Sequence, residues 1–288
     1  MRLARAAPWI AFASLCACRR NAPVPPIEPE STAPIAPSAP SYRTETVAHG
    51  GTIRGRVVFE GAPPSIPAVV VPENATPNIC GTNQVPPALV VSPTGGVRDT
   101  VVSIAGLDHG KALPATAPRI DQHGCQYVPH VAVGVAGQSV EFTSSDPTIL
   151  HTIRGYRGDQ GTESWFARAT PAGVTVRVPL DRAGLGTVYC DSGHTWMLGY
   201  VWTFAHPYFA VSESDGAFEM RDVPPGSYTL HAWHEGFTPQ PPGAGERVRF
   251  AGAMERDLAV TVPAEGTVSV RFVVSAAGIR AELDRDGG

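Results

Sequence analysis

The sequence predicts an all-β protein. From about Gly50 to Ser275, short apolar runs alternate with polar residues, and Gly and Pro are frequent between them. Alternation with a period of two places the apolar side chains of a strand on one face, and no long stretch shows a helical period. These observations predict β-sandwiches, and a chain of this length is expected to form one or two domains.

The alternation is clearest in three runs. Residues 53–60 alternate apolar and charged side chains, residues 174–178 alternate valine with Thr or Arg, and residues 268–272 alternate Val and Phe with Ser or Arg. Each run has the length and the branched apolar content of a strand. We therefore expect a strand in each of them.

A cluster of metal-binding residue types is the most specific feature of the chain. Cys190, His194 and Met197 lie within one short segment, and His151 lies upstream of it. Together they supply one thiolate, two imidazoles and one thioether. A mononuclear blue-copper site places two imidazoles and a thiolate in a trigonal plane with a weak thioether on the axis. The four residues therefore predict copper as a cofactor.

The expected strands explain how these residues could meet. If Cys190 ends one strand and the next begins near Gly199, then His194 and Met197 occupy the connecting loop. His151 follows a strand-like run and a turn-forming segment, so we expect it on a loop. A β-sandwich can bring those two loops together at one end.

Each ligand also has a structural alternative. A single buried cysteine usually acts as a small apolar side chain, and Met197 beside Trp196 is compatible with core packing. Zinc is the main rival ion, although a thioether is a poor zinc ligand and suits copper.

The stretch from Gln126 to Phe204 resembles a cupredoxin, a plastocyanin-like blue-copper domain. The resemblance is carried by Val128-Pro129-His130-Val131 with Gly137, by the segment from Asp146 to His151 and by the Cys-His-Met loop. It implies a Greek-key β-sandwich that holds one copper ion. One departure is the Cys190 to His194 interval, which has three intervening residues where the commonest versions have two.

Residues 1–18 are typical of an export signal, with two arginines followed by an apolar stretch too short to span a bilayer. The segment Leu15-Cys16-Ala17-Cys18 fits a bacterial lipobox, so we expect a lipoprotein acylated on Cys18. Cys16 at the middle position is unusual and leaves plain secretion open. Export implies an oxidising compartment, either the periplasm or the cell surface, with the lipid attached to a bacterial membrane.

Residues 19–49 are rich in Pro, Ala, Ser and Glu and nearly lack aromatic and branched apolar side chains. Such a composition cannot bury a core, so we expect a disordered, extended tether that holds the folded part off the membrane. The formal net charge of −4 and the absence of a basic cluster argue against nucleic-acid binding.

The segment from Tyr208 to Leu230 resembles the second half of a carboxypeptidase-regulatory-like, or transthyretin-like, β-sandwich. The turns Asp215-Gly216 and Pro224-Pro225-Gly226 carry this resemblance. The first half of such a domain has strands like those expected at 52–59 and 101–104, and both lie far upstream here.

The resemblance therefore implies one transthyretin-like sandwich made from 50–117 and 206–275, with the cupredoxin at 118–205 inserted between its halves. A tail is expected at 276–288. The alternative is two unrelated consecutive sandwiches, with the first strands belonging to the cupredoxin itself.

The five cysteines can be assigned by elimination. Cys16 leaves with the signal, Cys18 is the lipidation candidate and Cys190 is the proposed metal ligand. Cys80 and Cys125 remain as the natural disulfide pair in an oxidising compartment, with two free thiols as the alternative.

Two further residues are candidates for supporting roles near the metal. His130 precedes the expected copper loop in the resembling region and could approach the metal or form a second polar site, although structural hydrogen bonding is the alternative. Trp196 lies between His194 and Met197 and is expected in the apolar shell, which tunes the reduction potential of a metal site.

These features predict an electron-transfer protein that is not an enzyme. The chain lacks the His-x-His pair of multicopper oxidases, the Cys-x-x-Cys-His haem attachment and the Gly-x-Ser-x-Gly elbow. A redox protein such as a cytochrome or a membrane oxidoreductase is the expected partner, through a small, weak contact. Copper trafficking or storage, or a surface-binding scaffold with a structural metal, remain alternatives.

Overall fold

The computed structural model describes residues 42–158, 162–240 and 246–284. Within them, strands dominate, and the helical elements are the one-turn α1 (Pro77–Cys80) and the 3-10 turn η1 (Glu73–Ala75). The prediction of an all-β fold is therefore confirmed. The export signal, Cys18 and most of the expected tether lie outside the described residues. A search of the described chain for a helix long and apolar enough to cross a membrane finds none.

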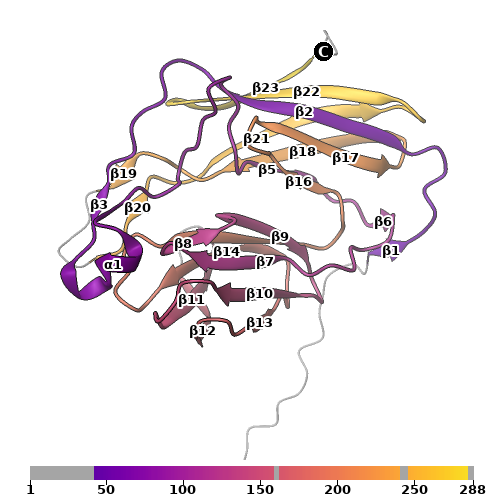
Figure 1. Cartoon of the computed structure of the whole chain (residues 1–288). Coiled ribbons are helices and arrows are strands. Elements are labelled where there is room, and N and C mark those ends of the chain that lie inside the picture. Colours follow the sequence, from indigo (N-terminus) through magenta and orange to yellow (C-terminus); the bar gives the residue numbers. More distant parts are fainter. Residues whose placement is uncertain (1–41, 159–161, 241–245, 285–288) are drawn as a thin grey trace, which may run out of the picture. The chain divides into compact units, whose positions relative to one another are not determined.

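One β-sandwich draws its strands from both ends of the described chain (Figure 1). Its two four-stranded sheets have the orders β16-β5-β18-β21 and β17-β2-β22-β23. The strands of the first sheet are β16 (Phe209–Val211), β5 (Val101–Ile104), β18 (Gly226–His234) and β21 (Met254–Val262). Those of the second are β17 (Ala217–Val223), β2 (Gly51–Phe59), β22 (Thr267–Ser275) and β23 (Gly278–Leu283). We call this unit the split sandwich.

The split sandwich has one core between its sheets. Ile53 of β2, Ile104 of β5, Leu230 of β18 and Phe272 of β22 are buried in a single apolar cluster. In β2 the buried residues Ile53 and Val57 follow the period-two alternation that the sequence shows, because alternate side chains point to one face, whereas the short central strand β5 is buried at all four positions. Strands from before residue 118 therefore share sheets and a core with strands from after residue 205.

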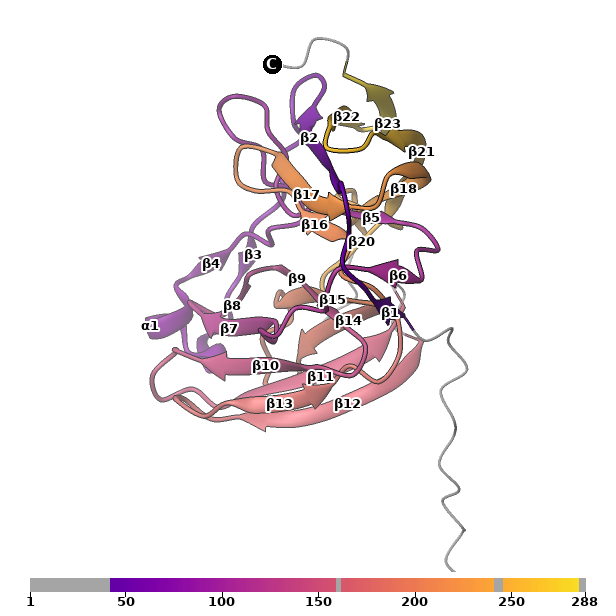
Figure 2. The same cartoon turned by 90° about the vertical axis from the view of Figure 1, so that its right-hand side faces the viewer.

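The chain between these halves forms a second unit, which we call the continuous sandwich (Figure 2). Its four-stranded sheet has the order β13 (Val176–Pro179), β10 (Ser139–Ser144), β7 (Arg119–His123) and β8 (Gln126–Val128). Its five-stranded sheet has the order β12 (Glu163–Thr170), β11 (His151–Arg157), β14 (Gly184–Cys190), β15 (Leu198–Phe204) and β9 (Val131–Val135). Ile120, Phe142, Ile153 and Val201 are fully buried between the two sheets.

Short strand pairs complete the fold, and two strands differ from the sequence prediction. The pairs are β1 (Arg43–Thr44) with β6 (His109–Gly110), β3 (Val69–Val70) with β4 (Asn83–Gln84), and β19 (Pro239–Gln240) with β20 (Arg249–Phe250).

β1 lies in the expected tether, and β23 lies in the expected tail 276–288. β23 forms because its backbone extends the sheet beside β22 and because Ile279 is buried in the split sandwich. In the sequence, the charged residues near Ile279 hide this apolar position.

The two sandwiches meet through a third apolar cluster. Trp233 and Val101 of the split sandwich are buried with Tyr200 and Val131 of the continuous sandwich, and the rings of Tyr200 and Trp233 lie 5.1 Å apart. Beside this cluster, His130 and Glu235 form a buried ion pair across the junction. These contacts join β9 and β15 to β5 and the end of β18.

Candidate metal centre

The proposed ligands lie at one end of the continuous sandwich, where β11 begins and β14 ends. β11 and β14 pair antiparallel with Ile153 opposite Cys190, which brings His151 beside the cysteine. His151 is thus the first residue of a strand, whereas the sequence placed it on a loop. His194 and Met197 occupy the connection between β14 and β15, as the spacing predicts.

Three of the four predicted ligands surround one point. The Cys190 Sγ atom lies 3.6 Å from Nδ1 of His151 and 3.4 Å from Nδ1 of His194. The two imidazole rings lie 4.8 Å apart, and all three side chains are buried. Two donors that bind one ion at about 2.0–2.3 Å are expected roughly 3.7 Å apart in a trigonal arrangement. The observed separations are close to that value.

The fourth predicted ligand, Met197, is fully buried in the same apolar cluster as Cys190 and Trp196. Its backbone N–H donates a hydrogen bond to the carbonyl of His194 at 3.0 Å, which forms a tight turn in the loop. The turn keeps the thioether-bearing residue close to the imidazole-bearing one, in a water-excluded environment.

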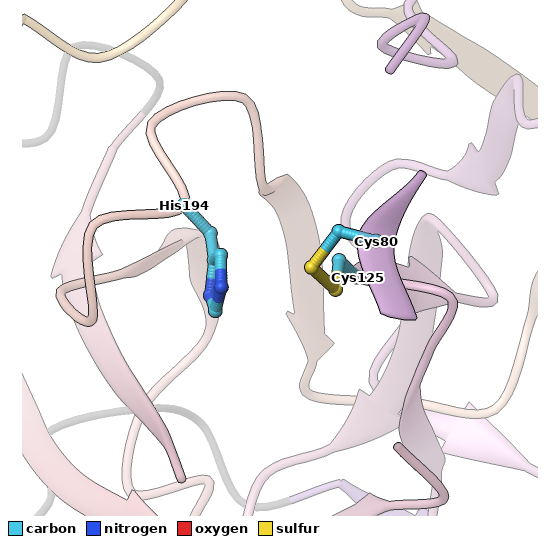
Figure 3. Close-up of side chains that lie close together, drawn as sticks. All are labelled: Cys80, Cys125 and His194. Carbon is cyan, nitrogen blue, oxygen red and sulfur yellow. A yellow bond between two sulfur atoms is a disulfide. The ribbon is translucent and has the colours of Figure 1, made fainter. Parts of the chain in front are cut away.

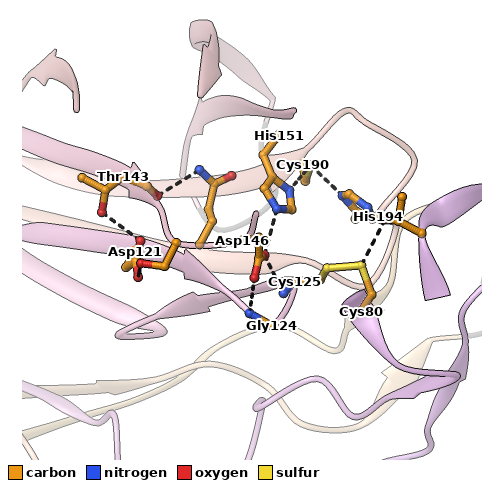
Figure 4. A network of polar contacts seen from close by, with 12 residues as sticks. Cys80, Asp121, Gly124, Cys125, Thr143, Asp146, His151, Cys190 and His194 are labelled. Atoms are coloured by element: carbon orange, nitrogen blue, oxygen red, sulfur yellow. Dashed lines mark hydrogen bonds and ion pairs between the residues drawn. A yellow bond between two sulfur atoms is a disulfide. The ribbon is translucent and has the colours of Figure 1, made fainter. Parts of the chain in front are cut away.

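Asp146 orients His151 by binding the ring nitrogen that does not face Cys190 (Figure 4). Nε2 of His151 donates to Asp146 Oδ2 at 3.0 Å, which leaves Nδ1 directed at Cys190. The same carboxylate accepts hydrogen bonds from the backbone N–H groups of Gly124 and Cys125, at 2.6 and 2.9 Å. A carboxylate behind a ligating histidine fixes the ring orientation and makes the imidazole a better donor.

Within the cluster, the pKa of His151 is raised and the pKa of Cys190 is lowered. Burial would lower the pKa of His151, but its hydrogen bonds to Asp146 and Cys190 raise that pKa to about 9. Burial would likewise raise the pKa of the Cys190 thiol, but hydrogen bonds from His151 and His194 lower it to about 6. At neutral pH the metal-free site therefore holds an imidazolium beside a thiolate, and the thiolate is the form that binds metal.

The predicted disulfide between Cys80 and Cys125 is present, so that prediction is confirmed. The structure also places it next to the metal ligands, which the sequence did not indicate. One ring nitrogen of His194 and the two disulfide sulfurs lie within 4.8 Å of one another. Trp196 donates its indole N–H to the Cys125 carbonyl at 2.9 Å and lies with its ring 5.3 Å from that of His194.

A segment between β19 and β21, residues 246–250, contacts the loop that carries His194. The backbone N–H of Val248 donates to the carbonyl of Thr195 at 2.9 Å. Arg247 pairs with Asp191 and lies over the Tyr189 ring, 4.6 Å from its centroid. No local sequence signal predicts these contacts, because they join residues more than fifty positions apart.

His130 lies at the junction between the sandwiches and pairs with Glu235. Burial would lower the pKa of His130, but Glu235 raises it above its usual value. Within the described chain, the groups of side chains close enough to share a metal do not include His130, His231 or His234.

The donor set fits a copper ion. One cysteine sulfur and two imidazoles converge in the buried interior, and a buried thioether belongs to the connection that carries His194. Soft sulfur together with imidazole is the donor combination that copper prefers. Asp146 supplies the outer hydrogen bond that such a site requires.

Several solved structures resemble part of the chain. A copper-containing nitrite reductase from Thermus scotoductus SA-01 is 23% identical over 33% of this chain and 24% of that chain, with a TM-score of 0.27. A purple cupredoxin from Nitrosopumilus maritimus is 20% identical over 31% of this chain and 100% of that chain, with a TM-score of 0.27. Amicyanin from Paracoccus versutus is 18% identical over 32% of this chain and 85% of that chain, with a TM-score of 0.28.

The matched part is about a third of this chain, and it spans only about a quarter of the nitrite reductase. No protein-family model matches the chain, and no curated protein matches it. These TM-scores are too low to support a functional assignment. The metal assignment therefore depends on the geometry of His151, Cys190 and His194 themselves.

Proposed function

We propose that this protein is a mononuclear copper protein that transfers electrons outside the cytoplasm. The observation that carries the proposal is the buried convergence of Cys190 with His151 and His194. Bound copper supplies a one-electron couple between Cu(I) and Cu(II). His151, Cys190, His194 and Met197 would hold the ion, with the Met197 thioether as the weak donor.

The protein's own residues would keep the site rigid. Asp146 fixes the ring of His151, the turn at Met197 fixes the loop, and Val248 fixes Thr195 from the segment before β21. A site that changes little between oxidation states lowers the reorganisation that accompanies electron transfer. The preformed ligand separations support this role.

Burial of the ligands favours electron transfer over catalysis. His151 is 0% exposed, Cys190 is 3% exposed and His194 is 2% exposed. These exposures leave little ligand surface for a substrate, whereas an electron does not need direct contact between its donor and acceptor.

The setting of this function follows from the first 49 residues. We propose that the chain is exported, is anchored to a bacterial membrane through a lipid on Cys18 and extends from it on a Pro-rich tether. A cytochrome or a membrane oxidoreductase would then be the redox partner. A labelled-palmitate experiment with a Cys18→Ala variant tests the anchor, and unchanged lipid incorporation would contradict it.

The decisive test of the metal proposal is copper titration of the purified protein. We expect one copper ion per chain, a strong visible absorption from the thiolate and a narrow hyperfine splitting in electron paramagnetic resonance. The copper should cycle with ferricyanide and ascorbate without release. A colourless protein that keeps Cu(I) would instead indicate storage or trafficking. A protein whose fold and binding do not change when a chelator removes the metal would indicate a scaffold.

A further inference from the structure

The disulfide lies beside a metal ligand, although it takes no part in the copper set. Figure 3 shows Cys80 and Cys125 next to the ring of His194. One atom from each of these three residues lies within 4.8 Å of the other two, and all three side chains are buried. His194 therefore belongs to two clusters, one with His151 and Cys190 and one with the two disulfide sulfurs.

Contacts other than the sulfur–sulfur bond hold both cysteines in place. The Cys125 N–H donates to Asp146, and the Cys125 carbonyl accepts from Trp196. On the other side, the Cys80 N–H donates to the Thr76 carbonyl at 3.0 Å, and the Cys80 carbonyl accepts from the side chain of Gln84.

Gln84 also links the backbone at Cys80 to the backbone at Gly124, the residue before Cys125. Its side-chain amide donates to the Gly124 carbonyl at 3.1 Å as well as to the Cys80 carbonyl. The two cysteines are therefore expected to stay near His194 when the bond between them is broken.

We propose that reduction of the Cys80–Cys125 disulfide creates a second, thiolate-rich metal site formed by Cys80, Cys125 and His194. The site would take a soft or borderline cation such as Zn²⁺ or Cu(I), because thiolate and imidazole are the ligands these ions prefer. This inference goes beyond the proposed electron transfer and does not depend on copper at Cys190.

The reduction is a thiol–disulfide exchange with a dithiol. One thiolate of the dithiol attacks a disulfide sulfur, and its second thiol displaces the mixed disulfide. The protein gains two electrons and two protons as two thiols, and the reductant becomes a disulfide. Metal binding then releases the thiol protons, because only thiolates ligate.

The geometry allows the new site with small movements. Sulfur and nitrogen ligands of one tetrahedral ion lie about 3.5–3.8 Å apart, given metal–ligand distances of about 2.0–2.3 Å. The three donor atoms already lie within 4.8 Å of one another. Cys80 ends the four-residue helix α1, so a local shift of this helix can adjust its sulfur. Since both sulfurs are buried, the exchange also requires this helix to open.

Sharing of His194 makes the two sites compete. Its Nδ1 faces Cys190 at 3.4 Å in the described state. Rotation of the ring toward the reduced pair would remove one imidazole from the copper set. The thiol redox state of the compartment would thereby control which ligand set holds a metal.

The test uses Co²⁺ as a probe in the full-length chain with Cys190→Ser, which removes the first site's thiolate, and with Cys16→Ser and Cys18→Ser, which leave Cys80 and Cys125 as its two cysteines. After treatment with tris(2-carboxyethyl)phosphine, a thiol assay should count two protein thiols at Cys80 and Cys125. We expect one Co²⁺ per chain with thiolate-to-cobalt absorption in the near ultraviolet. The untreated protein should bind Co²⁺ at least tenfold more weakly and lack that absorption.

Two matched variants complete the test. In the Cys190→Ser background, Cys80→Ser with Cys125→Ser should abolish the absorption, and His194→Ala should weaken Co²⁺ binding at least tenfold. Circular dichroism monitors the fold throughout. Reduced, folded protein without cobalt–thiolate absorption overturns the proposal, and so does loss of the fold on reduction. Neither result bears on the copper titration, which uses oxidised protein.

Discussion

Nε2 of His151 donates a hydrogen bond to the carboxylate of Asp146 at 3.0 Å, and both residues are buried. This contact fixes which nitrogen of His151 faces Cys190. The same carboxylate also holds the backbone of Cys125, so one side chain connects His151 to the disulfide. Asp146 therefore positions the ring of His151 toward Cys190.

Replacement of Asp146 by Asn should weaken copper binding about 10- to 100-fold, because the ring of His151 loses its charged acceptor. Competition with a chromophoric chelator measures the affinity. Asp121→Asn is a matched control, since Asp121 accepts hydrogen bonds from Thr143 and Ser145 in the same sandwich without contacting a proposed ligand. Equal affinities in the two variants would contradict a positioning role for Asp146.

Cys190→Ser should abolish the visible absorption and the redox activity of the copper protein while the fold is retained. The thiolate is the source of the charge-transfer absorption, and a hydroxyl cannot replace it. Absorption spectroscopy checks the colour, and circular dichroism checks the fold. Colour that survives this substitution would remove Cys190 from the site.

Met197→Leu should keep copper but raise its reduction potential, because it removes a weak axial donor that favours Cu(II). Protein-film voltammetry measures the shift. Met220→Leu is a suitable control, since Met220 is buried in the core of the split sandwich. If both variants keep the wild-type potential, the Met197 thioether is not bound.

Copper binding at pH 7 should release about one proton per ion. The pKa of about 6 for Cys190 makes its thiol mostly deprotonated at this pH, whereas the pKa of about 9 for His151 makes its imidazole mostly protonated. The metal must displace the His151 proton, so the apparent affinity should rise between pH 7 and 9. Calorimetry in buffers of different ionisation enthalpy counts the protons, and a count near zero would contradict this protonation state.

The ion pair of His130 and Glu235 should make stability depend on pH. Glu235 raises the folded-state pKa of His130, so its contribution is fully present below the unfolded pKa of about 6.5 and is lost as pH rises through the folded pKa. Removing one partner of a buried pair costs roughly 3–5 kcal/mol. Urea unfolding of His130→Gln should therefore differ most from wild type near pH 6, and a pH-independent difference would exclude this ion pair as the cause.

The sequence predicts those parts of the molecule whose signals are local. Alternating side chains predict β2 and β22, and the spacing within one loop places His194 and Met197 after Cys190. β23 was missed because its single well-buried apolar residue, Ile279, stands among charged neighbours. An edge strand of this kind forms because a neighbour offers hydrogen bonds, and that information is not local.

The supporting residues of the site were the least predictable. Asp146 was expected only as the start of the segment 146–151 that carries the cupredoxin resemblance, and its hydrogen bond to His151 depends on how this segment meets β11. Arg247 and Val248 contact the ligand loop from a distant part of the chain. Pairings of this kind follow from the packing of two sandwiches, so periodicity and motif spacing do not reveal them.

The hydrogen bond between Val248 and Thr195 has a mechanical consequence. Thr195 directly follows His194, and Val248 lies only a few residues before β21, the strand at one edge of the sheet β16-β5-β18-β21. A displacement of residues 246–250 relative to the continuous sandwich would therefore shift the backbone beside His194. Under the proposed function, a binding event at this segment would change the reduction potential of the centre without any contact to its ligands.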